Sequence, residues 1–251
     1  MTMKNFLLNF NKGINFSIYT NVHAATLLIT YIIMVIIIIN KEKISNIRNK
    51  NRIRVLFGII LLLFMVVRRG AYIYYQIYDI RYHLDLGFCN ALVILFIIYC
   101  LTGNKKLYCF CYYGSFVGPF LSIMFPAINI SINNFSFIIF LLFHNILFLM
   151  NLVFCVFENY KLEKSKYFFI MFVFMIYIFI TNVVDLISGC SYNQLSNFIA
   201  NRYLQNEIIN SLVNNFWISM LIYIILGLIC FKLANIFLEN FGGKYEKKSN
   251  I

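Results

Sequence analysis

The chain has 251 residues, of which 62% are hydrophobic and only 12% are charged, and its mean hydropathy is +0.80. A typical soluble domain is about half apolar and a quarter charged, so this composition excludes a soluble globular protein. The formal net charge is +12, but the Lys and Arg residues lie between apolar runs rather than along one face. That pattern excludes nucleic acid as the expected partner and indicates membrane lipids.

The cysteines give no sign of a disulfide framework or a metal site. Seven are present, mostly inside the apolar runs, without CxxC pairs or the spacing of a zinc site. Residues 1–21 lack the basic-then-apolar order of a secretory signal, so no processing is expected. We therefore expect one domain over residues 1–251, with neither a metal nor a cofactor, and the sequence leaves the oligomeric state open.

Apolar runs of about twenty residues, the length that crosses a bilayer as a helix, recur along the chain. The predicted spans are residues 22–39, 55–78, 84–101, 107–125, 135–157, 167–187 and 217–237. The second must pass Arg68 and Arg69 to reach full length, so it is expected to carry charge at depth. Gly118 and Pro119 should kink the fourth. The sequence predicts an all-helical cell-membrane protein with seven transmembrane helices.

The distribution of basic residues predicts the orientation. The segments after the first, third, fifth and seventh spans contain six, two, three and three Lys and Arg residues. The segments on the other side of the membrane contain two, three, none and one. Positive residues gather on the cytoplasmic side of membrane proteins. The N-terminus is therefore expected outside and the C-terminus inside.

Polar groups gather in the outer half of this predicted bundle, above all in the stretch YHLDLGFCNA at residues 82–91. Ionisable groups at membrane depth cost about 3 kcal/mol each on insertion scales, so they turn toward one another or toward a wet cavity. We predict one polar cavity open to the outside, in which Arg68 or Arg69 contacts an aspartate. The residues expected there are Arg68, Arg69, Asp79, His83, Asp85, Cys89, Asn90, His144, Asn182 and Asp185.

Each of these residues also has a purely structural explanation. Cys89 can be buried as a small hydrophobic side chain, and His144 can serve as a hydrogen-bond donor between helices. An aspartate beside Arg68 or Arg69 can form a structural ion pair.

Several short motifs in chain order carry a family resemblance. They are LDLGFCNA, the basic turn GNKK, YYGSFVGPFLSIMFP, the histidine within FLLFHNILFL, and GCSYNQL after the sixth span. In this order they resemble the YwaF-type integral membrane proteins of bacteria, which are similar in turn to an animal membrane acyltransferase of ether phospholipids.

The resemblance implies roles for particular residues. The family's helix-start cysteine falls on Cys89, its mid-helix histidine on His144, and its loop motif on residues 189–195, which contain Tyr192. The chain departs from the family at Gly87, where relatives usually have a histidine, and at Ser191, where they have asparagine.

Two classes of function follow from these residues. The first is an acyltransferase acting on lysophospholipid or ether lipid, with Cys89 as nucleophile, His144 as base and Asp85 or Asp185 orienting it. Substrate would be held by Arg68, Arg69, His83, Asn182 and Tyr192. The second is a non-catalytic transporter or receptor-like module for an anionic small molecule or lipid, or a subunit of a membrane complex.

Overall fold

The computed structural model describes residues 15–16, 20–76, 78, 87–126, 130–131, 137, 140–158, 164–188 and 216–241. These residues are helical, apart from short connections and a pair of two-residue antiparallel strands, β1 (Asn15–Phe16) and β2 (Ile130–Ser131). The predicted all-helical class is therefore confirmed for the described residues.

The described residues form α-helices and two π-helical turns. In chain order they are α2 (Asn21–Ile39), α3 (Lys41–Ser45), α4 (Lys50–Tyr74), α6 (Phe88–Thr102), α7 (Lys105–Ser115), the π-helical turn η1 (Phe116–Phe120), α8 (Leu121–Met124), the π-helical turn η2 (Leu142–Ile146), α10 (Leu147–Phe157), α11 (Lys164–Ser188) and α14 (Phe216–Phe241).

Five helices in the described residues are long and apolar enough to cross a membrane: Asn21–Ile39, Lys50–Tyr74, Lys105–Met124, Tyr167–Asp185 and Met220–Glu239. A multi-pass arrangement is thus supported. The third and fifth predicted spans correspond to shorter apolar helices, Phe88–Thr102 and Phe143–Phe157. The count of seven spans is not confirmed, and it stays a prediction.

Two details of the predicted spans can be compared with the structure. Helix α4 continues without a break through Arg68 and Arg69, as expected for a span that carries charge at depth. The expected start of the third span at residue 84 is wrong for α6. Gly87 is extended, with φ −60° and ψ 141°, and the helix begins at Phe88, because glycine is a poor helix former that suits the N-cap.

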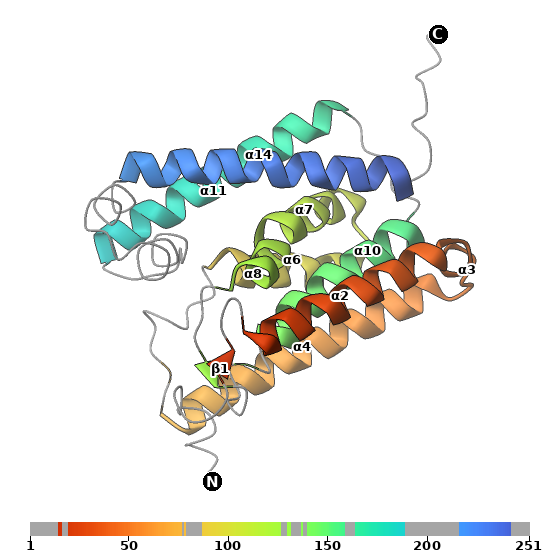
Figure 1. The fold of residues 1–251 in the computed structure, drawn as a ribbon. Coiled ribbons are helices and arrows are strands. Elements are labelled where there is room, and N and C mark those ends of the chain that lie inside the picture. The colour runs from red at the N-terminus through yellow and green to blue at the C-terminus, as the bar shows by residue number, and fades with distance from the viewer. Residues whose placement is uncertain are drawn as a thin grey trace.

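The helices form a layered bundle in which α7 and η1 are central (Figure 1). Helices α2 and α4 lie on one side and α11 and α14 on the other, with α6, α7 and α10 between them. In the span Lys105–Met124, 61% of the residues are buried within the protein, against 17% to 22% in the other long spans. The outer helices therefore expose their apolar side chains to lipid, while α7 and η1 are enclosed by protein.

Tyrosine side chains explain why α7 occupies the centre. Tyr108, Tyr112 and Tyr113 are fully buried. Their hydroxyls donate to the Asn151 carbonyl at 2.7 Å, to the Ala234 carbonyl at 2.9 Å and to Asn235 Oδ1 at 2.5 Å. A hydroxyl in hydrocarbon needs such a partner, so these tyrosines fix α7 against α10 and α14.

The predicted orientation can be tested with fusion reporters. A reporter fused after Ile251 is expected to be cytoplasmic, and one fused before Met1 is expected to be outside, because the basic segments favour the cytoplasmic side. Alkaline phosphatase and fluorescent-protein activities of the paired fusions measure this. The opposite pattern, or two ends on the same side, would refute the N-outside, seven-span arrangement.

Candidate functional site

Two π-helical turns pack against each other in the half of the bundle where the polar residues were predicted. The turn η1 contains Pro119 and η2 contains His144, and the two turns are in contact. Proline lacks an N–H and cannot continue the α-helical hydrogen-bond ladder, and Pro119 lies in a π-helical turn rather than in regular α-helix. π-helical turns occur frequently at functional sites, which makes this junction the region to examine for chemistry.

Cys89 faces the inside of the bundle at this junction. Its Sγ atom shares a hydrogen bond with Ser122 Oγ of α8 at 3.8 Å. A Cβ atom at Gly118 would lie 3.1 Å from the Cys89 sulfur and 2.7 Å from the Phe88 ring. The approach of α6 to η1 therefore requires glycine at position 118, and it holds the sulfur against protein rather than lipid.

The later start of α6 changes the environment of Cys89. With Gly87 as the N-cap, Cys89 is the second residue of the helix, and no side chain caps this end. The first amide N–H groups of a helix have no partner within the helix. They form, together with the helix dipole, a site that favours negative charge. The sulfur therefore lies beside these amides, at the positive end of the α6 dipole.

The hydrogen bond of His144 fixes its tautomer. Its Nδ1 atom lies 2.8 Å from the Phe140 carbonyl oxygen, one turn earlier in the same helix. A carbonyl oxygen can only accept, so Nδ1 carries the proton. In the neutral ring Nε2 then holds a lone pair, and this is the atom that a general base uses.

Cys89 and His144 lie at similar levels of the bundle. Helices α6 and α10 are in register at Tyr99 and Phe154, whose ring centroids are 5.8 Å apart, and each site residue is ten positions before its anchor. Both helices run away from the site, so the two residues lie within about one helical turn of the same level. No hydrogen bond joins them among the described residues, and η1 packs against both α6 and η2.

The two arginines of α4 differ in their burial. Arg68 is buried, with 9% of its surface exposed, and its guanidinium lies 5.2 Å from the centroid of the Phe143 ring in η2. Arg69 is half-buried. The sequence could not decide which arginine points inward; the structure identifies Arg68, which lies beside the turn that carries His144.

Among the remaining predicted residues, Asn90 of α6 is half-buried, and the others divide into two groups. On α11, Asn182 donates to Met220 Sδ of α14 at 3.2 Å, and Asp185 is half-buried near the end of the helix. Asp79, His83, Asp85 and Tyr192 lie outside the described residues. The expected contact between an arginine and an aspartate therefore stays a prediction, as does the polar cavity.

One cleft within the described residues is apolar rather than polar. It has a volume of about 80 Å³ and lies between η1, α11 and α14, with Val117, Phe174, Ile178 and Gly227 among its lining residues. It is distinct from the predicted polar cavity, and its lining offers contacts to hydrocarbon only.

Two residues that shape this region, Ser122 and His23, were not predicted from the sequence, and Gly118 was predicted only to kink the fourth span. His23 of α2 is buried, and its Nε2 donates to the Ile123 carbonyl at 3.0 Å. That carbonyl is in the last turn of α8, where helix carbonyls have no partner within the helix. A histidine at the start of an apolar run, ahead of a distant Pro-terminated helix, was the available signal.

A comparison with protein-family models gives a match over residues 16–198, to the TMEM164 family. The chain belongs to the TMEM164 family. No curated protein and no solved structure matches the chain significantly. The matched segment of this TMEM164-family protein includes both π-helical turns, Cys89, His144 and Arg68, whereas α14 lies beyond it. Membership in a membrane protein family agrees with the long apolar helices.

Proposed function

We propose that this TMEM164-family chain is a membrane acyltransferase that moves a fatty acyl group between phospholipids through Cys89. The observation that carries the proposal is the place of Cys89 at the second position of an uncapped helix, with its sulfur turned into the bundle. The resemblance to YwaF-type proteins and to an ether-lipid acyltransferase supports the same residue.

The proposed reaction has two steps. In the first, His144 Nε2 takes the thiol proton while the Cys89 sulfur attacks the ester carbonyl of a donor phospholipid. A C–S bond forms, the C–O ester bond breaks, and the lysophospholipid leaves with the proton from His144. In the second, His144 removes the proton of an acceptor hydroxyl, whose oxygen attacks the thioester and releases the thiol.

The first-turn amides of α6 have the role of an oxyanion hole in this mechanism. They are donors at the N-terminus of a helix, next to the carbon that the sulfur would attack. Arg68, beside η2, is suited to hold a lipid phosphate. The Phe140 carbonyl already binds Nδ1 of His144, so Asp85 or Asp185 is proposed only to balance the positive charge that His144 acquires. Catalytic hydrogen bonds are often long without substrate, so Cys89 and His144 are expected to close on each other when the donor binds.

A thioester on Cys89 is the direct test. The purified full chain, incubated with a phospholipid carrying a clickable acyl chain, should acquire a label that neutral hydroxylamine removes and that peptide mass spectrometry assigns to Cys89. Gly118→Ala should lower labelling at least about tenfold, because the new Cβ would collide with Phe88 and the Cys89 sulfur, and a misplacement of about 1 Å costs about a hundredfold in rate.

The control is Gly227→Ala, which introduces the same methyl group where no atom lies within 4 Å. It should leave labelling unchanged. Absence of label on Cys89 in a folded wild-type protein with a range of acyl donors would contradict the acyltransferase proposal.

The second candidate is a non-catalytic module that binds an anionic lipid or small molecule. The observation in its favour is Arg68, a buried cation at η2. Ionisable groups at such depth generally mark a ligand path or a polar interaction that matters for function. Binding of an anionic ligand that depends on Arg68 but not on Cys89, with no thioester formed, would favour this function.

A further inference from the structure

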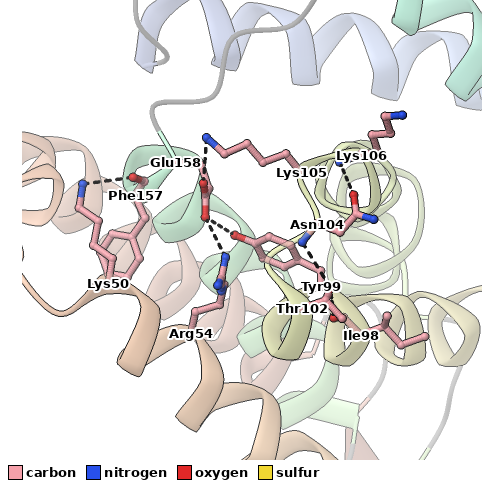
Figure 2. Close-up of polar contacts among 10 residues, drawn as sticks. All are labelled: Lys50, Arg54, Ile98, Tyr99, Thr102, Asn104, Lys105, Lys106, Phe157 and Glu158. Atoms are coloured by element: carbon pink, nitrogen blue, oxygen red, sulfur yellow. Dashed lines mark hydrogen bonds and ion pairs between the residues drawn. The ribbon is translucent and has the colours of Figure 1, made fainter.

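A cluster of charged side chains lies at the end of the bundle opposite to Cys89. Figure 2 shows Glu158, the residue after α10, among side chains from three other helices. Glu158 Oε1 accepts a hydrogen bond from the Tyr99 hydroxyl at 3.0 Å and pairs with Arg54 Nη1 at 3.5 Å. Its Oε2 pairs with Lys105 Nζ at 3.4 Å. We call Arg54, Tyr99, Lys105 and Glu158 the Glu158 cluster.

The backbone around the cluster is shaped to fit it. Gly103, between α6 and α7, has φ +72°, and the guanidinium of Arg54 lies 2.5 Å from the position that a Cβ would occupy there. Any other residue at 103 would therefore both strain the turn and displace Arg54. Nearby, Lys50 Nζ donates to the Phe157 carbonyl at 3.2 Å, at the negative end of α10.

Positive charge exceeds negative charge at this end of the bundle. Arg54 and Lys105 pair with one carboxylate, that of Glu158, and Lys50 and Lys106 lie in the same region (Figure 2). The N-terminus of α7 adds the positive end of a helix dipole, with the Lys106 N–H bound by Asn104 Oδ1 at 3.0 Å.

The surface beside these cations is apolar. Ile98 and Leu101, in the last turns of α6, are 40% and 42% exposed. An anion that binds the turn between α6 and α7 therefore meets hydrocarbon-compatible side chains on one flank and ammonium groups on the other. That combination fits a phospholipid, whose phosphate and acyl chains are joined, better than a free anion.

We propose that the α6–α7 turn beside the Glu158 cluster is a binding site for the phosphate of an anionic phospholipid. Lys105 and Lys106 contact the phosphate, Glu158 holds Lys105 and Arg54 in place, and the acyl chains lie along Ile98 and Leu101. This site is at the opposite end of α6 from Cys89, so its lipid is a bound partner rather than the proposed substrate.

Native mass spectrometry of the purified full chain tests the site. The protein is titrated with phosphatidylglycerol and, separately, with phosphatidylcholine of the same acyl chains. The wild type should bind phosphatidylglycerol about tenfold more tightly. Each lysine near a surface contributes about 1 kcal/mol to anionic lipid binding, so Lys105→Gln with Lys106→Gln should weaken it roughly tenfold to thirtyfold. Lys106→Gln alone, which keeps the Lys105–Glu158 pair, should weaken it about fivefold.

The matched control is Lys41→Gln with Lys43→Gln, which removes the same charge from exposed positions on α3. It should change the affinity less than about twofold. Equal binding of the two lipids, or an equal loss in both double variants, would overturn the proposal in favour of general attraction to the surface. Displacement of phosphatidylglycerol by inorganic phosphate at equal concentration would assign the site to a free anion and overturn its lipid occupant.

Discussion

Glu158→Ala is expected to lower the free energy of unfolding by about 2 to 3 kcal/mol. Removing one partner of a buried ion pair costs roughly 3 to 5 kcal/mol, because the other charge stays buried and unpaired. The side chains of Arg54 and Glu158 are 13% and 16% exposed, so some solvent remains to screen the stranded guanidinium. Lys105 is 68% exposed and adds little of its own.

Glu42→Ala provides the matched control for this variant. Glu42 is an exposed glutamate on α3, and its loss changes the net charge by the same amount. Surface substitutions of this kind stay within about 0.5 kcal/mol. Thermal unfolding in one detergent, followed by size-exclusion chromatography of heated samples, compares the two variants. Equal stability of the two would show that the Glu158 cluster does not hold the ends of α4, α6 and α7 together.

The cost of burying charge made much of the fold predictable from the sequence. It led to the expectation that the second span passes Arg68 and Arg69, and α4 does so. It also indicated that one arginine points inward, but adjacent residues on a helix give no means of choosing between them. Packing of α4 on η2 makes that choice, and it selects Arg68 through the Phe143 ring.

Other features depended on contacts that a sequence pattern does not contain. Gly87 is extended and caps α6, which begins at Phe88, whereas hydropathy alone placed the start at residue 84. Glu158 follows an apolar run as a single acidic residue, which a hydropathy pattern assigns to a loop. It contacts Arg54, Tyr99 and Lys105 only because the ends of α4, α6, α7 and α10 meet in the folded chain. The hydropathy of the spans does distinguish the central helix. Lys105–Met124 has the lowest mean hydropathy of the five long spans, 1.3, and it lies at the centre of the bundle.

The largest expected effect on activity comes from Cys89→Ala. Acyl transfer from a phospholipid donor to a lysophospholipid acceptor should fall by roughly 10³-fold or more, because the nucleophile that splits the reaction into two steps is removed. His144→Ala should cost a similar factor, and the double variant should be no slower than either single one, since residues that act as a unit are strongly non-additive. Initial rates of labelled product in vesicles containing the purified variants measure all three.

Cys100→Ala is the control for the loss of a cysteine from the same helix. Cys100 is fully buried in the core, close to Gly58, so its replacement should lower stability by about 1 kcal/mol and leave the initial rate of folded protein unchanged. If the rate losses of Cys89→Ala and His144→Ala multiplied in the double variant, the two residues would act independently. They would then not form a nucleophile and base pair during turnover. Full activity in Cys89→Ala would exclude the thioester and leave the ligand-binding function of the buried Arg68 as the better account of this site.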